Sequence, residues 1–303
     1  MSKNIYKNKS SIAFVGSKWR YRNKIFDIII NEFKDNLNDK FLIIDLFGGS
    51  GSLTIIFKEI FKNSIFVLND YDEIITDKEN KNKIDNTITR FNEIKNEILN
   101  NINIENLKNK KIKLNQENKN KTYIVLNKYE KEINENIQLK KLLSSKLCFN
   151  SRMLNFDKKP DIFNRLNKSD NKLYYENFKD VEIIHDDFKN ILNNINELKN
   201  KYDIKDNKHV LLLLDPPYLY FDMSLTYHVE CWAFQKYLNL LKVFINNYNI
   251  ILFEDKKNAL GDIIDFMSDL LNINIKYKIF DLSKTKQENK VRDQMIIKND
   301  ILN

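Results

Sequence analysis

Glycine and proline are scarce in this chain, and most of them lie in three short motifs. Among 303 residues there are five glycines and three prolines. Four of the glycines and two of the prolines occur in FVGSK (14–18), DLFGGSG (45–51) and DPPY (215–218). Glycine lets the backbone approach a ligand or adopt positive φ, and proline fixes φ and removes a donor, so both mark places where main-chain shape matters. We therefore expect these three motifs to carry the chemistry of the protein.

The composition is typical of a globular enzyme. The chain is 42% apolar and 30% charged, which is enough to build one large core with an inserted subdomain. No apolar run approaches the roughly 18 to 20 residues of a membrane span, and the first ten residues lack the apolar stretch of a secretory signal. The two cysteines and three histidines do not have the spacing of metal ligands. We expect a cytoplasmic protein that contacts no membrane and holds no metal.

Positive charge is concentrated in two segments. The net charge is +8, and residues 141–179 hold nine Lys or Arg against four Asp or Glu, while residues 276–298 hold seven against three. Such a surplus favours a polyanionic partner. A solvated lysine-rich face is the alternative explanation.

Hydrophobic periodicity predicts alternating strands and helices. The predicted strands are 41–45, 65–68, 181–184, 210–214 and 250–253, and the predicted helices are 52–61, 191–198, 232–244 and 263–271. This alternation is typical of an α/β fold with a mostly parallel, doubly wound sheet. Residues 277–281 and 292–298 predict a C-terminal antiparallel hairpin at the sheet edge. Apolar residues at helical spacing in the polar region 78–179 predict a mainly helical insert between 1–77 and 180–303.

Two of the three motifs, DLFGGSG and DPPY, lie at the carboxyl ends of predicted strands. In an open α/β sheet, ligands bind beyond the carboxyl ends of the strands, so the glycine loop and DPPY should lie near each other. Nineteen residues after Gly51 comes Asp70, at the end of the next apolar run. A carboxylate at that place can accept hydrogen bonds from ribose hydroxyls. Together, these features predict a cofactor that contains adenosine, although a tight strand-to-helix turn would also use such glycines.

DPPY resembles the catalytic tetrapeptide of amine-methylating DNA methyltransferases, and that resemblance implies an exocyclic amine on a nucleobase as its target. Such an amine is a poor nucleophile because its lone pair is delocalised into the ring, so a site that methylates it needs hydrogen-bond acceptors rather than a metal. The Asp215 carboxylate and the Pro216 carbonyl are the natural acceptors, and Pro216 and Pro217 offer no competing backbone donor. The Tyr218 ring offers a face on which a flipped base can stack. His185 and His228 are less favoured candidates for the proton acceptor.

As a set, these motifs resemble the Dam-like, alpha-class N6-adenine DNA methyltransferases, which use S-adenosylmethionine. FVGSK is similar to the family's W-A-G-G-K segment, DLFGGSG to its F-x-G-x-G loop, and DPPY to its catalytic tetrapeptide. Residues 146–152 resemble the C-F-N segment of its DNA-recognition region, and 291–299 its closing strand. The resemblance implies a Rossmann-like methyltransferase fold, with 1–77 and 180–303 as the catalytic domain and 78–179 as the target-recognition insert.

The resemblance also implies roles for individual residues. Lys18 would meet the cofactor carboxylate, and Asp45 would bind the cofactor's amino end or, alternatively, cap the following turn. The catalytic residues implied are Asp215, Pro216, Pro217 and Tyr218, and the S-adenosylmethionine-binding residues implied are Phe14, Lys18, Asp45, Phe47, Gly49, Gly51, Asp70, Asp187 and Phe188.

The expected partner is double-stranded DNA, bound through the insert. Lysines of such a segment contact the DNA phosphates and position the duplex, whereas arginine and asparagine read base edges. The candidates are Arg152, Asn155, Lys158, Lys159 and Arg165. We expect a monomer, and a cognate restriction endonuclease is a further candidate partner. Methylation of cytosine N4 or of RNA adenine, and a catalytically silent DNA-binding protein, are the alternative functions.

Overall fold

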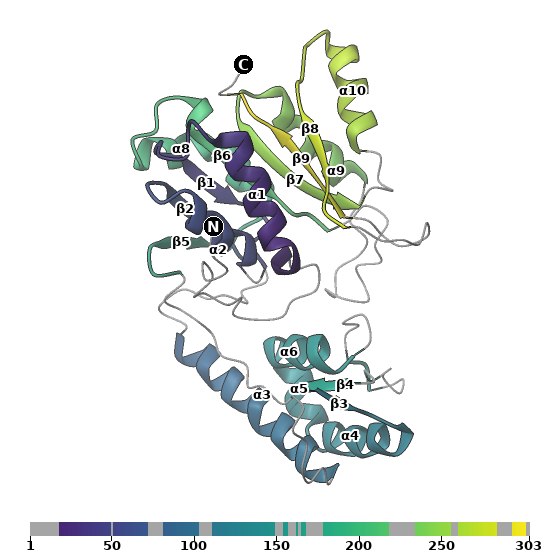
Figure 1. Ribbon diagram of the computed structural model, residues 1–303. Coiled ribbons are helices and arrows are strands. Elements are labelled where there is room, and N and C mark those ends of the chain that lie inside the picture. Colours follow the sequence, from purple (N-terminus) through teal and green to yellow (C-terminus); the bar gives the residue numbers. More distant parts are fainter. Residues whose placement is uncertain are drawn as a thin grey trace.

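The computed structural model is an α/β protein built on a seven-stranded sheet (Figure 1). The strand order is β5-β2-β1-β6-β7-β9-β8, in which the first five strands are parallel and β9 runs antiparallel to both of its neighbours, β7 and β8. The strands are β1 (Leu42–Asp45), β2 (Ile65–Asn69), β5 (Val181–Ile184), β6 (Val210–Leu214), β7 (Asn249–Asp255), β8 (Lys278–Asp281) and β9 (Asp293–Lys298). The structure describes residues 18–49, 51–71, 81–102, 111–148, 154–156, 162, 165–167, 178–217, 234–255, 260–283 and 293–300.

Helices cover both faces of the sheet (Figure 1). In the sheet-containing part of the chain they are η1 (Lys18–Tyr21), α1 (Arg22–Phe33), α2 (Ser52–Ile60), α7 (Phe188–Asn193), α8 (Ile195–Lys201), η4 (Asn207–His209), α9 (Phe234–Leu241), η6 (Lys242–Ile245) and α10 (Leu260–Leu271). None of the helices in the described ranges is long and apolar enough to cross a membrane.

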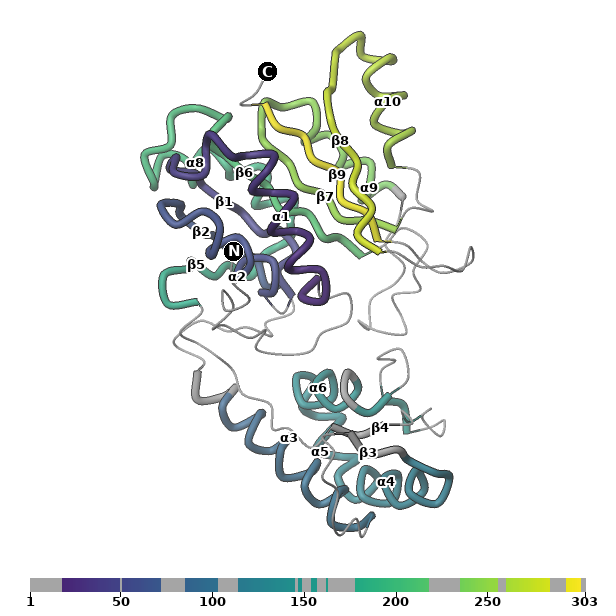
Figure 2. Tube along the Cα trace, in the orientation of Figure 1, coloured from purple at the N-terminus to yellow at the C-terminus, as the bar shows by residue number. Residues whose placement is uncertain are grey.

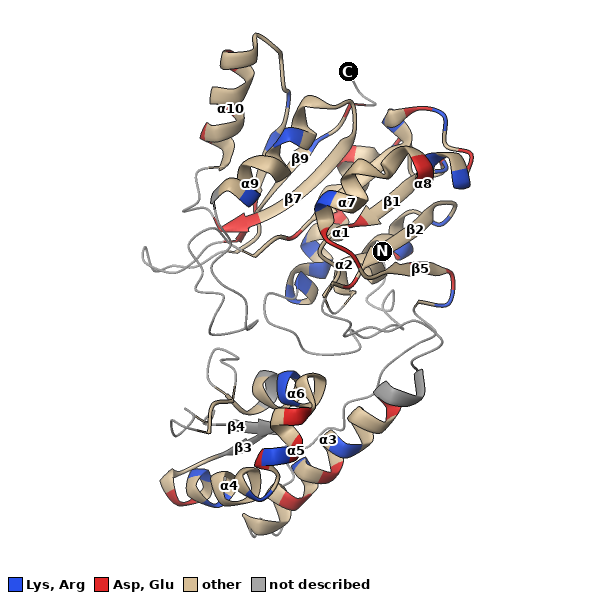
Figure 3. Cartoon of the chain, turned by 180° about the vertical axis from the view of Figure 1, so that it is seen from behind, with Lys and Arg blue, Asp and Glu red and all other residues tan. Residues whose placement is uncertain are grey.

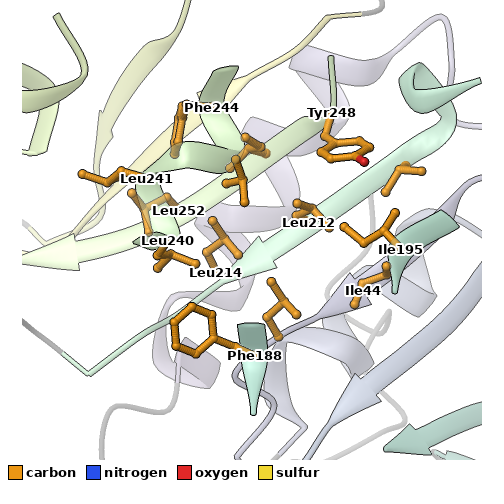
Figure 4. Packing of buried hydrophobic residues seen from close by; sticks show 14 of the residues in the cluster. Ile44, Phe188, Ile195, Leu212, Leu214, Leu240, Leu241, Phe244, Tyr248 and Leu252 are labelled. Carbon is orange, nitrogen blue, oxygen red and sulfur yellow. The ribbon is translucent and has the colours of Figure 1, made fainter. Parts of the chain in front are cut away.

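The central strand β6 is buried on both faces. Leu211 and Leu213 belong to one core cluster, with α1 and α2, while Leu212 and Leu214 belong to another, with α7 to α10. Figure 4 shows the second cluster, in which Leu212 and Leu214 lie among side chains of neighbouring strands and covering helices. A run of apolar residues without alternation is typical of a parallel strand covered on both sides, which is why 210–214 could be recognised from sequence.

The first cluster is closed by α1. Ile25, Ile29 and Phe33 recur every four residues, so they share one helix face, and all three are buried. The Phe33 ring packs edge-on against Phe41 and Phe61, with centroids 6.4 and 5.6 Å away. Sequence analysis did not predict α1.

A helical unit separates β2 from β5 along the chain. It contains α3 (Lys81–Asn101), α4 (Gln116–Lys128), α5 (Glu130–Glu135) and α6 (Ile137–Leu147). Figure 2 shows that β2 and β5 lie side by side although this whole unit lies between them in sequence. The unit has its own buried cluster, which includes Phe91, Ile94, Leu126 and Leu143. Figure 1 shows the helical unit beyond the edge of the sheet where the parallel strands have their carboxyl ends.

Ion pairs join the helices of this unit. The guanidinium of Arg90 in α3 binds both carboxylate oxygens of Glu132 in α5, at 2.5 and 2.8 Å. Lys128 in α4 binds Glu97 in α3 at 2.8 Å. These pairs fasten α3 to α4 and α5; neither cation lies in residues 141–179, where the positive surplus was counted.

The structure differs from the predicted elements in three places. The helix predicted at 191–198 is two helices, α7 and α8, which meet at Asn194. The insert contains a small antiparallel pair, β3 (Lys111–Lys113) with β4 (Arg165–Asn167), that periodicity did not indicate because each strand has only three residues. The predicted C-terminal hairpin is present, but β9 inserts between β7 and β8, so that β8 forms the sheet edge.

Candidate active site

Acidic side chains gather at the carboxyl ends of the central strands. Asp45 ends β1, Asp215 follows β6, and Glu254 and Asp255 end β7. Figure 3 shows the acidic end of β7 on the side of the sheet that faces the helical unit. Because β1, β6 and β7 are parallel neighbours, these carboxyls share one edge. In the described parts of the chain, no three His, Cys, Asp or Glu side chains form a group that could hold a metal ion.

The glycine loop begins directly after β1 and requires its glycines. Gly49 and Gly51 have φ of 49° and 66°, in the left-handed region that favours glycine. A Cβ on Gly48 would lie 2.7 Å from Leu68 Cγ and 3.0 Å from the carbonyl oxygen of Asn69. Two backbone bonds close the loop: the Gly48 amide donates to Asn69 at 2.9 Å, and the Gly51 amide donates to Gly48 at 2.7 Å. The loop therefore brings its backbone against the end of β2, and α2 starts from Gly51.

Asn69 ties three segments of the site together. Its side-chain amide nitrogen donates to the carbonyls of Leu46 (3.2 Å) and Asp186 (2.9 Å), and its oxygen accepts from the Asp186 amide (3.1 Å). The residue is 2% exposed. Asn69 thus fastens the end of β1 and the loop after β5 to the end of β2. In the sequence Asn69 stands beside Asp70, the predicted ribose-binding residue, and an amide at the end of an apolar strand was the available signal for its structural role.

We predict that Asn69→Ala lowers the free energy of unfolding by about 2 to 3 kcal/mol, because three hydrogen bonds are lost and buried carbonyls are left without donors. Urea denaturation will measure it. The matched control is Asn63→Ala, which removes one exposed side-chain bond to the Asn38 carbonyl and should cost below about 1 kcal/mol. Equal costs for the two variants would contradict this role of Asn69.

Lys18 and Asp215 form the principal ion pair of the site. The Lys18 ammonium lies 2.6 Å from Oδ1 and 2.8 Å from Oδ2 of Asp215. Lys18 is 2% exposed and the Asp215 side chain 17%. Burial raises the pKa of Asp215, and the Lys18 ammonium offsets part of that effect. A buried ammonium therefore supports the charged, hydrogen-bond-accepting form of this carboxylate.

The segment that carries Lys18 is anchored to the sheet at a second point. Arg20 and the Tyr21 hydroxyl both bind the carboxylate of Asp293 at the start of β9, the latter at 2.6 Å. Asp293 is 3% exposed. Since η1 is fixed through both Asp215 and Asp293, the position of the Lys18 ammonium depends on two strands rather than on its neighbours in sequence.

Asp45 is a buried carboxyl with one oxygen already bound. Its Oδ2 accepts from the Thr54 hydroxyl in α2 at 2.8 Å, and its Oδ1 is buried without a hydrogen-bond partner among the described residues. Burial, with a smaller contribution from the negative charge of Asp215, raises the pKa of Asp45 to about 7, against the offsetting bond from Thr54. Backbone N–H groups of Thr54 and Phe47 also lower the pKa of this carboxyl, so a cap on the following turn stays an alternative role for Asp45. It presents one oxygen that a cationic donor would satisfy.

Asp70 lies at the end of β2, in contact with the loop after β5. Its amide donates to Ile184 at 2.9 Å, and its carbonyl oxygen lies 2.7 Å from Nδ1 of His185. The residue is completely buried. His185, considered above as a proton acceptor, thus contacts the backbone of the predicted ribose-binding residue rather than Asp215.

The predicted adenine site has a mixed outcome. Phe188 and Phe47 lie together, with ring centroids 5.6 Å apart. Phe188 is 6% exposed and belongs to the main core, and the Asp187 carboxylate accepts from the Lys189 amide at 2.9 Å as the N-cap of α7. Both residues have a structural role in the protein itself, and their contact with a cofactor stays a prediction.

Glu254 and Tyr237 are site residues that sequence analysis missed. Glu254 is completely buried, and one of its oxygens accepts from the side-chain amide of Gln294 on β9. Tyr237, from α9, is 1% exposed, and burial together with the charges of Glu254 and Asp215 raises its pKa. An acidic residue that ends a buried strand was the only sequence signal for Glu254.

Several predicted residues lie outside the described part of the chain. These are Phe14, Tyr218, Arg152, Lys158 and Lys159. Asn155 is described and exposed, and Arg165 lies in β4, where only its backbone is described. Pro216 is buried and Pro217 half-buried, directly after Asp215.

The structure thus brings Lys18, Asp45 and Asp215 to one edge of the sheet, beside the glycine loop and Asp70. In comparisons with known proteins, no family model matches the chain, and no curated protein matches its sequence.

Proposed function

We propose that the protein transfers a methyl group from S-adenosylmethionine to N6 of adenine in duplex DNA. The observation that carries the proposal is the placement of Asp215, held by a buried ammonium, on the strand next to the glycine loop and Asp45. This arrangement provides acceptors for an amine on one strand and a nucleotide-type loop on its neighbour. The resemblance of the three motifs to Dam-like enzymes supports the same reaction.

The residues at this edge are suited to S-adenosylmethionine. The buried Oδ1 of Asp45, which has no partner among the described residues, fits the cofactor's ammonium group. The backbone of the glycine loop can approach a ligand closely, and we expect the Asp70 carboxylate to bind the ribose hydroxyls. When bound, the cofactor supplies an electrophilic methyl group.

Asp215 and Pro216 act on the target amine. The Asp215 carboxylate and the Pro216 carbonyl accept the two N6 hydrogens, which favours a more tetrahedral nitrogen with its lone pair toward the methyl group. A carboxylate has about four lone-pair sites, so Asp215 can accept from Lys18 and from the amine together. N6 gains the methyl group as the methyl–sulfur bond breaks and a neutral thioether leaves; N6 then releases one proton, which water can accept. Positioning and electrostatic stabilisation carry most of the rate.

Access to a base in a duplex requires that the base leave the helix. Flipping costs a few kcal/mol, which stacking and hydrogen bonds in the site offset. We expect the Tyr218 ring to supply the stacking. The helical unit lies on the side of the sheet where the strands end (Figure 1), so a duplex held there would present its flipped base to Asp215.

One assay tests the proposed function. Tritiated S-adenosylmethionine is incubated with unmethylated duplex DNA and, in parallel, with RNA, and the products are digested to nucleosides. Labelled N6-methyladenine from DNA is the expected product. Label in N4-methylcytosine or in RNA would identify the alternative substrates, and binding of DNA without transfer would identify a silent DNA-binding protein.

DNA-contact variants test the role of the insert. Exchange of Lys158 and Lys159 for alanine should weaken binding to every duplex and flatten its salt dependence, because phosphate contacts release counterions regardless of sequence. Arg152→Ala or Arg165→Ala should cost about 1 to 3 kcal/mol, chiefly on the preferred site. Binding titrations at several salt concentrations, on specific and random duplexes, separate the two classes. Parent-like binding by all of these variants would remove the recognition role from this segment.

A further inference from the structure

Glu254 is a buried carboxyl beside the proposed target site that the reaction described above does not use. It is completely buried at the end of β7. One oxygen, Oε1, accepts from the side-chain amide of Gln294, its cross-strand neighbour on β9. The other, Oε2, is buried and has no hydrogen-bond partner among the described residues. An unsatisfied buried carboxyl oxygen is costly, so its retention suggests a ligand.

The sheet register brings Glu254 next to the catalytic tetrapeptide. In the parallel pair of β6 and β7, Leu214 lies opposite Leu252. β6 ends at Leu214; if the same register continued for two more residues, it would put Pro216 level with Glu254. Tyr237 from α9 lies close enough to both carboxyls that the charges of Glu254 and Asp215 raise the pKa of its phenol. Glu254 therefore borders the place where the Pro216 carbonyl would meet the target amine.

The groups around Glu254 favour its neutral form. Burial raises its pKa to about 7, the hydrogen bond from Gln294 and the influence of the nearby Leu260 backbone amide offset part of that effect, and the negative charges of Asp255 and Asp262 add to the rise. The Tyr237 hydroxyl, from the helix packed against it, is neutral. Since Gln294 donates to Oε1, a proton on the carboxyl is best placed on Oε2. Glu254 can then act as a hydrogen-bond donor.

We propose that protonated Glu254 donates a hydrogen bond from Oε2 to the ring nitrogen adjacent to the target amine, which is N1 of adenine. The proposal rests on the proposed function, because it deepens the recognition made at the same site. Asp215 and Pro216 recognise an amine only, whereas a donor beside them recognises an amine next to an unprotonated ring nitrogen. Adenine has this pair on the edge that flipping exposes. Guanine has an oxygen in place of the amine at C6 and a hydrogen on N1, so it offers neither member of this pair on the same edge and would be rejected.

The first experiment removes the ring nitrogen and the donor separately. Duplexes with adenine or 1-deazaadenine at the methylated position are compared in kcat/KM for the parent, Glu254→Gln and Glu254→Ala. The parent should prefer adenine by about tenfold to a hundredfold. Glu254→Gln, whose amide still donates, should keep most of that preference. Glu254→Ala should lose activity on adenine and show a preference near one. Glu197→Gln, an exposed change on α8, is the matched control and should behave as the parent.

The second measurement uses the pH profile. With the cofactor saturating, the parent's kcat/KM for DNA should fall as pH rises above about 7, because ionised Glu254 no longer donates and repels the ring nitrogen. Glu254→Gln should show no such fall. This comparison decides the matter even if Glu254→Ala does not fold.

The outcomes separate the two levels of inference. Equal parental rates on adenine and 1-deazaadenine, or the same alkaline fall in Glu254→Gln, would overturn the role of Glu254 and leave the proposed function standing. No methylation of any nucleic acid by the parent would overturn the proposed function itself. If cytosine is the methylated base, the same comparison is made with 3-deazacytosine, since N3 stands beside its amine.

Discussion

Asp215→Asn will reduce methyl transfer by at least about a hundredfold while S-adenosylmethionine still binds. The carboxylate is expected to accept a hydrogen from the target amine, and an amide that presents a donor there cannot stabilise the transition state in the same way. Single-turnover transfer of tritiated methyl groups will measure the rate, and calorimetry the cofactor affinity. Asp269→Asn, an exposed change on α10, is the matched control and should retain parental values. Near-parental turnover by Asp215→Asn would contradict the assignment.

The same substitution has a structural cost that must be separated from the chemical one. Lys18 is 2% exposed, so neutralising Asp215 removes the ion-pair partner of a buried ammonium, at a cost of roughly 3 kcal/mol. In the double variant with Lys18→Met and Asp215→Asn both charges are absent, and most of that free energy of unfolding should return. Activity should not return. Recovery of methyl transfer in the stable double variant would show that Asp215 acts only through folding.

Asp45→Asn will weaken S-adenosylmethionine binding by about tenfold to a hundredfold and remove its pH dependence. The pKa of Asp45 is raised to about 7, and only the ionised carboxylate forms a charge-assisted bond with the cofactor's ammonium. Parental affinity should therefore fall nearly tenfold for each pH unit below 7. Calorimetry between pH 5.5 and 7.5 covers this range while an α-amino group, with a pKa near 8, keeps its proton. Parental affinity that is constant over this range would remove Asp45 from the ammonium site.

The free energy of unfolding of the parent should fall as pH rises, whereas its affinity for the cofactor should increase. Because the folded-state pKa of Asp45 lies above the ordinary value of 3.8, the native protein binds a proton that the unfolded chain releases between about pH 4 and pH 7. Across that interval the free energy of unfolding of the parent falls by up to about 4 kcal/mol through this group, and that of Asp45→Asn does not. In urea denaturation without cofactor, the stability advantage of Asp45→Asn should grow from pH 4 to pH 7 and stay constant above it. The variant would then be more stable but bind the cofactor less tightly.

Much of the fold was predictable because the signals were local. The all-apolar run 210–214 indicated a buried parallel strand, and β6 occupies those residues. Short strands and segment boundaries were not predictable in the same way. Three-residue strands such as β3 carry too little periodicity, and Asn194, where two helices meet, resembles any other asparagine of this asparagine-rich chain.

The site was predictable only in its residue types. A carboxylate followed by two prolines after a buried strand predicted an amine-binding site, which stays a prediction, and glycines after β1 predicted a special backbone conformation, which the positive φ of Gly49 and Gly51 bears out. The contact of Lys18 with a cofactor carboxylate stays a prediction, whereas its ion pair with Asp215 was not predicted from the sequence.

By itself, the sequence determined the α/β class, the order of most strands and helices, and the edge of the sheet where the motifs lie, since periodicity and turn residues act over a few neighbouring positions. Tertiary structure alone decided which groups meet there. Lys18 and Asp215 are 197 positions apart in the sequence. Asn69 and Asp186 are hydrogen-bonded although the whole helical unit lies between them in the sequence. The pKa values of Asp45 and Glu254 likewise depend on burial, which arises only when distant segments pack together and exclude water.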